Sequence, residues 1–135
     1  MLPALRSDGT LPPGTHDATL DELLTAYPAR NPQRQMLNDS LRVVVEQLWR
    51  LDPTLVILVD GSYVTAKAEP NDIDLLLITP TYTELAIQQY LDQVCPVEAV
   101  SIHLYAEPQL PSALLTFFTT SRLGRPKGIV QLRRP

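Results

Sequence analysis

Two short apolar runs, residues 54–59 and 73–79, lie close together in the middle of the chain. Each is rich in leucine, isoleucine and valine and is bounded by turn-forming residues, which is typical of a buried β-strand. A longer segment before them, residues 32–51, carries apolar side chains at the spacing of an α-helix: Leu37, Leu41, Val44, Leu48 and Leu51. A helix followed by two strands favours an α/β or α+β domain built on a small mixed sheet flanked by helices.

Two capping boxes predict further helices. Thr19 and Glu22 begin a short helix that runs through residue 24. Thr81 and Glu84 begin another helix that ends before residue 96. Its apolar residues are expected near one face: Leu85, Leu91 and Val94.

Residues 99–105 alternate between apolar and polar side chains, as a half-buried strand does. The apolar side of this predicted strand carries Val100, Ile102 and Leu104, and its polar side carries Ser101, His103 and Tyr105. After it we predict a last helix at residues 111–120 and a short strand at residues 129–132.

The chain has 135 residues, enough for one hydrophobic core, so we predict a single domain in which residues 1–18 form an extended, loop-like segment. The apolar runs are far shorter than a membrane span, and the first residues do not form a basic-then-apolar leader. The lone Cys95 excludes an internal disulfide. We therefore expect a cytoplasmic protein that does not contact membranes.

Two aspartates next to the second apolar run are the feature that points to chemistry. Gly61 and Ser62 follow the first run directly, and nine residues later come Asp72 and Asp74. Residues two apart on a strand project from the same face, so the two carboxylates repel each other unless a cation lies between them. Mg²⁺ prefers oxygen ligands and is commonly held by one or two carboxylates together with substrate phosphates. Gly61 would let the backbone approach a triphosphate, and Ser62 with the amides after it would hydrogen-bond the triphosphate oxygens.

This Gly-Ser, nine-residue spacer and Asp-x-Asp pattern resembles the active-site motif of the polymerase-beta-like nucleotidyltransferase superfamily. The superfamily includes antibiotic nucleotidyltransferases, polymerases and the minimal nucleotidyltransferases of bacterial toxin-antitoxin pairs. Beyond the motif, residues 11–16, 31–34 and 124–128 resemble a little-characterised bacterial family of stand-alone domains of this kind, which brings no established substrate.

The resemblance implies a nucleotidyltransferase fold and the transfer of a nucleoside monophosphate from a nucleoside triphosphate to an acceptor hydroxyl. It implies that Gly61 and Ser62 bind the nucleotide and that Asp72 and Asp74 bind Mg²⁺, or Mn²⁺ in its place. Paired acids suit this reaction because two metal ions stabilise both the entering and the departing oxygen. Lys67, close in sequence, is a candidate for neutralising phosphate charge, and an exposed lysine without that role is the alternative.

Active members of the superfamily usually carry a third carboxylate on the next strand. Here the polar side of that strand offers no aspartate, and Glu98 just before it is a possible substitute. His103 is a candidate metal ligand or proton acceptor because its pKa lies near neutrality, and a structural histidine satisfied by a hydrogen bond is the alternative.

Two other function classes remain open. The first is a catalytically degenerate domain that binds a nucleotide or a protein partner, for example as one half of a toxin-antitoxin or phage-defence pair. The second is a structural domain whose two aspartates pair with arginines. For an active enzyme, the acceptor is a protein side chain, an RNA end or a small molecule, and a partner protein or a homodimer would complete the cleft.

Overall fold

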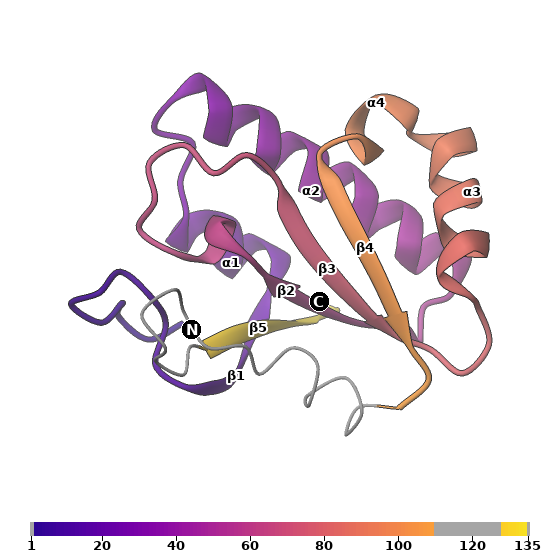
Figure 1. Cartoon of the computed structure of the whole chain (residues 1–135), viewed down its shortest axis with the longest axis horizontal. Helices are drawn as coiled ribbons and strands as arrows, with labels where there is room; N and C mark the ends of the chain where they lie inside the picture. Colours follow the sequence, from indigo (N-terminus) through magenta and orange to yellow (C-terminus); the bar gives the residue numbers. More distant parts are fainter. Residues whose placement is uncertain (1, 110–127, 135) are drawn as a thin grey trace.

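A five-stranded sheet with helices packed on it forms the body of the protein (Figure 1). The computed structural model describes residues 2–109 and 128–134. The strands are β1 (Gly14–Thr19), β2 (Val56–Asp60), β3 (Ile73–Ile78), β4 (Ile102–Glu107) and β5 (Gly128–Arg133). The helices are α1 (Leu20–Ala26), α2 (Pro32–Leu51), α3 (Glu84–Val94) and α4 (Pro96–Ala99), with a 3-10 turn, η1 (Ser62–Val64), after β2. None of the described helices is long and apolar enough to cross a membrane.

The sheet is mixed, with strand order β1-β5-β2-β3-β4. β2 runs antiparallel to both β3 and β5, whereas β3 is parallel to β4 and β1 is parallel to β5. The register places Asp60 opposite Asp74 and Asp74 opposite His103. This mixed sheet with its helices confirms the predicted α/β (α+β) class.

Alternation along the strands divides the apolar residues between the two faces of the sheet. One face packs with the helices in the main core, where Ile57 and Leu75 lie with Leu41 and Leu48 of α2, all four fully buried. The opposite face carries a smaller buried cluster: Leu58, Leu76 and Ile129. Asp74 and His103 share the face of this smaller cluster, because Asp74 is two residues from Leu76 and opposite His103. The described helices therefore pack on one face of the sheet, and Asp74 lies on the other face.

The sequence predicted α2 and α1 well because their signals are local. α2 spans the predicted residues, with the Asn31 side chain capping its first turn, and its apolar stripe is buried. α1 begins after the predicted capping box, in which Thr19 and Glu22 each bond the other's backbone amide.

The prediction that residues 1–18 form a loop was wrong for their last part. β1 covers Gly14–Thr19 and pairs in parallel with β5. Most of its residues are polar, and only Ala18 is fully buried, so the apolar alternation expected of a half-buried strand is missing. The strand exists because a distant segment supplies its hydrogen-bonding partners.

The prediction for α3 was wrong in its cap and in two of the three residues expected near one face, Leu85 and Val94, whereas Leu91 is buried. Thr83, not Thr81, is the N-cap, and its hydroxyl oxygen accepts from the Ala86 amide at 3.1 Å. Leu85 is 66% exposed and Val94 is 42% exposed, whereas the buried residues of the helix are Ile87 and Leu91. A carboxylate oxygen of Glu84 instead accepts from the Ala106 amide of β4. The side chain that the predicted capping box required therefore makes a tertiary hydrogen bond.

The predicted strand at residues 99–105 begins later than expected. Residues 96–99 form α4, and Val100 is 80% exposed, so its apolar character does not mark a buried strand position. From Ile102 onward the alternation holds, with Ile102 buried and both His103 and Tyr105 exposed. The predicted strand at residues 129–132 is confirmed as β5, and the predicted helix at residues 111–120 lies outside the described residues.

Candidate metal site

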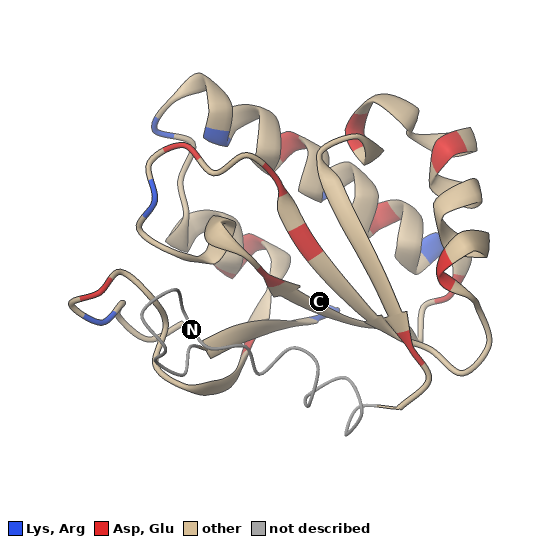
Figure 2. Ribbon diagram, viewed as in Figure 1, with Lys and Arg blue, Asp and Glu red and all other residues tan. Residues whose placement is uncertain are grey.

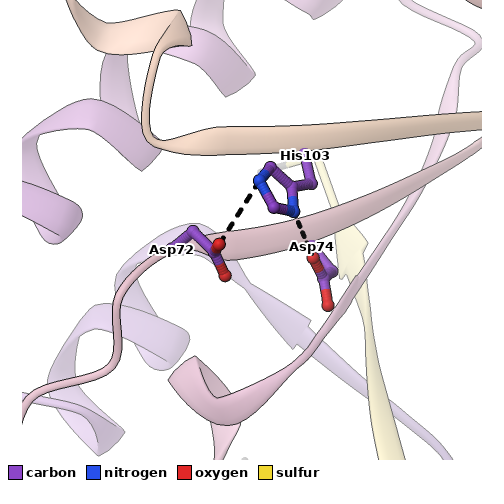
Figure 3. A group of neighbouring side chains, drawn as sticks. All are labelled: Asp72, Asp74 and His103. Carbon is purple, nitrogen blue, oxygen red and sulfur yellow. Dashed lines mark ion pairs between the residues drawn. The ribbon is translucent and has the colours of Figure 1, made fainter.

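Three potential metal ligands meet where β3 and β4 begin (Figure 3). His103 lies between the two aspartates, with its Nε2 3.3 Å from Oδ2 of Asp72 and its Nδ1 3.5 Å from Oδ1 of Asp74. One ligand atom from each of the three residues lies within 4.8 Å of the others. The two carboxylates are thus on the same side of the sheet, and an imidazole is the ion-pair partner that they share.

The cluster is open to solvent but not fully exposed. The side chains of Asp72, Asp74 and His103 are 35%, 28% and 55% exposed, respectively. Asp72 directly precedes β3, and Asp74 and His103 are opposite each other in the parallel β3–β4 ladder. Strand register therefore fixes Asp74 opposite His103, and Asp72 directly precedes the paired residues.

The Gly-Ser corner lies against the same aspartate. Gly61 has a φ of 88°, a conformation that side chains disfavour, and a Cβ added to it would lie 2.8 Å from Oδ2 of Asp74. The turn then closes through the Val64 amide, which donates to the Gly61 carbonyl at 3.3 Å, and the Thr65 amide, which donates to the Ser62 carbonyl at 3.2 Å. Glycine at this position lets the backbone after β2 approach the carboxylate directly.

Two other candidates lie elsewhere. Lys67 is exposed on the loop between η1 and β3 and lines a pocket beside Tyr27 and Arg34, whose described lining includes none of the three clustered ligands. Glu98, considered as a substitute third acid, is in α4 and does not belong to the ligand group among the described residues.

Tyr105 is a neighbour of the site that the functional prediction did not use. It lies two residues after His103 on β4 and is 41% exposed. Burial raises the pKa of its hydroxyl above the ordinary value, and the negative charges of Asp74 and Asp72 raise it further. The sequence could have indicated Tyr105 as a neighbour of the site, because residues two apart on a strand lie on the same side and Tyr105 is two residues after His103.

Arg34 is the second residue that the sequence analysis missed. Its guanidinium donates to the carbonyls of Tyr63, Thr65 and Lys67 at 3.1, 2.9 and 2.7 Å. Gln33, its neighbour on α2, donates to the Pro70 carbonyl at 2.7 Å. The first turn of α2 therefore holds the whole loop that runs from the Gly-Ser corner to Asp72.

Comparison with known proteins gives a family but no activity. The model of the DUF6932 family, described as a family of unknown function, matches residues 3–133. No curated protein and no solved structure matches the chain.

Proposed function

We propose that this chain, which belongs to the DUF6932 family, is a divalent-metal-dependent nucleotidyltransferase. The observation that carries the proposal is the contact between the Gly-Ser corner and the acidic cluster, because Gly61 approaches Asp74 while Asp74 and Asp72 share His103. A backbone corner next to two carboxylates is an arrangement that could hold a polyphosphate together with its metal ion.

The donor set fits a divalent cation. Two carboxylates and an imidazole within 4.8 Å offer three ligand atoms on one side of the sheet, and the side chains remain partly open for a substrate oxygen. We assign Asp72 and Asp74 as ligands of Mg²⁺ or Mn²⁺ and His103 as the third ligand in place of the usual carboxylate. When bound, the cation would neutralise phosphate charge and stabilise the oxygens that enter and leave.

The residues of this chain then have separate roles in the reaction. Gly61 and Ser62 orient the triphosphate through the backbone of the corner. The acceptor hydroxyl oxygen attacks the α-phosphorus, the bond from that phosphorus to the bridging oxygen breaks, and pyrophosphate leaves with the electron pair. The hydroxyl proton is lost to solvent or to a carboxylate of the cluster. Such a reaction belongs in the cytoplasm, where nucleoside triphosphates are available.

Transfer of label tests this function. The protein is incubated with α-labelled nucleoside triphosphates, Mg²⁺ or Mn²⁺, and three acceptor classes: the protein itself with a co-purified partner, RNA and a small-molecule mixture. We expect metal-dependent labelling of one class, with Asp72→Asn and Asp74→Asn each lowering the rate by about a hundredfold or more, since each removes a metal-binding charge.

Asp39→Asn is the matched control, because Asp39 is exposed on α2 and its hydrogen bond from Gln35 can be kept by asparagine. Full activity in the two site variants would contradict the proposal. So would labelling that persists after the metal is chelated.

A second candidate, nucleotide or partner binding without transfer, is favoured by one observation. The residue of β4 that faces Asp74 is a histidine, where active superfamily members are expected to have an acid. In that case nucleotide binds with metal but no label is transferred, and the chain would act through a protein partner or a homodimer, as in a toxin-antitoxin or phage-defence pair. Equilibrium binding of labelled nucleotide, measured beside the transfer assay, separates the two functions.

A further inference from the structure

A second concave site lies away from the Asp72–Asp74–His103 cluster. It is a pocket of about 320 Å³ between the end of α1, the start of α2 and residues 65–68 of the loop before β3. Figure 2 shows basic positions at the start of α2 and on the facing loop, with one acidic position further along that loop. The charged residues in its described lining are all cationic: Arg30, Arg34 and Lys67. The pocket is positive although the chain as a whole has a net charge of -4.

Arg34 brings a buried positive charge to this pocket. The residue is 6% exposed, and its hydrogen-bond partners are the three backbone carbonyls of the loop. Its guanidinium carbon lies 5.5 Å from the ring centre of Tyr27 and 5.3 Å from that of Tyr63. None of these partners carries a negative charge at neutral pH, and burial lowers the pKa of the guanidinium. The carbonyls accept three hydrogen bonds from the guanidinium, but the charge itself is not neutralised within this set.

Two further cations and a helix terminus add to this potential. Arg30 and Lys67 both line the pocket and are exposed to solvent. Asn31 caps α2, a helix of 20 residues, so the positive end of the helix dipole points to the same region. Three positive charges that converge on a concave surface favour a multivalent anion over a neutral ligand.

We propose that this pocket binds a phosphate-bearing ligand. Small-molecule pockets span about 300 to 1,000 Å³, and this one is at the lower end, which fits a compact ligand instead of a polymer. The ligand contacts Arg30 and Lys67 at the rim, while Arg34 supplies a fixed charge at the wall. This site requires no metal and no reaction, so it stands or fails separately from the proposed nucleotidyl transfer.

Calorimetric titration of the full chain with tripolyphosphate tests the proposal. The buffer contains a chelator and about 0.15 M salt, so that neither the metal site nor weakly screened charges contribute. We expect saturable binding that persists in Asp72→Asn. The double variant Arg30→Gln with Lys67→Gln should weaken it about five- to tenfold, as expected for two partly solvated charge contacts.

The control removes two exposed charges elsewhere, Arg42→Gln with Arg50→Gln, both on α2. It should leave the affinity unchanged. No detectable binding, or equal weakening in both double variants, would overturn the proposed site. A parallel titration with ATP identifies the source of the phosphate: tighter binding than tripolyphosphate indicates a nucleotide, and equal binding indicates an inorganic polyphosphate.

Discussion

At the scale of single residues, Gly61 has two separate reasons to be glycine. Its φ is positive, and its Cα lies so close to Asp74 that an added Cβ would be 2.8 Å from Oδ2. Gly14 also has a positive φ, 110°, but an added Cβ there would meet nothing within 4 Å. Substitution of Gly14 therefore measures backbone strain alone, whereas substitution of Gly61 adds a clash with Asp74.

We predict that Gly61→Ala lowers the free energy of unfolding by about 2–4 kcal/mol, and that Gly14→Ala costs about 1–2 kcal/mol, because only the first adds a clash to the strain. Urea denaturation gives both values. Gly61→Ala should also remove the thermal stabilisation by Mn²⁺, since the carboxylate of Asp74 must move. Equal costs for the two variants would show that the approach to Asp74 does not matter.

His103 leads to a prediction about the choice of metal. Mg²⁺ strongly prefers oxygen ligands, whereas Mn²⁺ accepts imidazole more readily. At equal concentrations, Mn²⁺ should therefore raise the melting temperature more than Mg²⁺ does, and His103→Asp should shift the preference toward Mg²⁺. Thermal unfolding with each metal measures this.

His16→Gln is the control for the metal preference. The His16 ring contacts the Pro12 carbonyl at 2.7 Å and does not belong to the ligand group. The same metal preference in wild type and His103→Asp would remove His103 from the ligand set.

Some site residues could be placed from the sequence because a local pattern determines their position, and others could not. Asp72 and Asp74 could be placed on one side of the sheet because strand alternation is a local rule. The approach of His103 to both aspartates depends on the β3–β4 register, which no short pattern encodes. Lys67 was a candidate for neutralising phosphate charge from its position in the sequence, and its place in the lining of the pocket beside Arg34 depends on how the loop folds.

At the scale of elements, the start of α2 supports the loop before β3. The Asn31 side-chain oxygen accepts from the Arg34 amide at 2.8 Å, and its amide nitrogen donates to the Ala68 carbonyl at 2.8 Å. Thr83 caps α3 with a single bond from the Ala86 amide. One cap thus joins a helix to a distant loop, and the other serves only its own helix.

We predict that Asn31→Ala and Thr83→Ala each cost about 1 kcal/mol from the lost cap, with Asn31→Ala costing more because it also releases the loop. Hydrogen exchange should quicken at the amides of residues 65–71 in Asn31→Ala and not in Thr83→Ala. Unchanged exchange in that loop would mean that Arg34 and Gln33 hold it without Asn31.

Helices and strands could be predicted where the residues of the element itself carry the pattern that specifies it. α1 and α2 follow from caps and periodicity, and β2 and β3 from apolar runs within one or two residues of the predicted ends. β1 was missed because its polar residues become a strand only beside β5, and the cap of α3 was misplaced because Glu84 bonds to β4. Both errors arise where tertiary contacts override local preference.

At the scale of the whole molecule, two buried tyrosines link stability to alkaline pH. Burial raises the pKa of Tyr27 to about 12, with the nearby Arg34 charge opposing the shift. Burial raises the pKa of Tyr63 as well, again against Arg34. Their hydroxyls donate to the Val64 carbonyl and to the Asn38 side chain, so the folded state keeps both protons.

We predict that this stability is fully present below about pH 10, the ordinary tyrosine pKa, and is lost as the pH rises toward 12, because ionisation favours the unfolded chain. Urea denaturation between pH 9 and 11 should show a loss of about 2–3 kcal/mol, to which each tyrosine contributes about half. Tyr27→Phe should reduce the slope, although its stability at neutral pH is lower. A pH-independent free energy of unfolding across this range would contradict the prediction.

The fold class followed from the succession of helices and strands, but the strand order did not. The sequence gives no local sign that β5 lies between β1 and β2, since that placement depends on pairings between segments far apart. β2 and β5 each lie between two neighbouring strands, and both carry apolar residues that are buried on the two faces of the sheet.

The central position of β5 has a consequence for how the protein is made. Residues 128–133 are synthesised long after β1 and β2, yet they pair with both strands. Until these residues have been translated, β1 lacks its parallel partner strand. The edge of β2 that pairs with β5 then keeps unpaired backbone N–H and C=O groups. Emergence of this segment from the exit tunnel is therefore the step that completes the sheet, and a nascent chain stalled before it would be the form most exposed to proteases and chaperones.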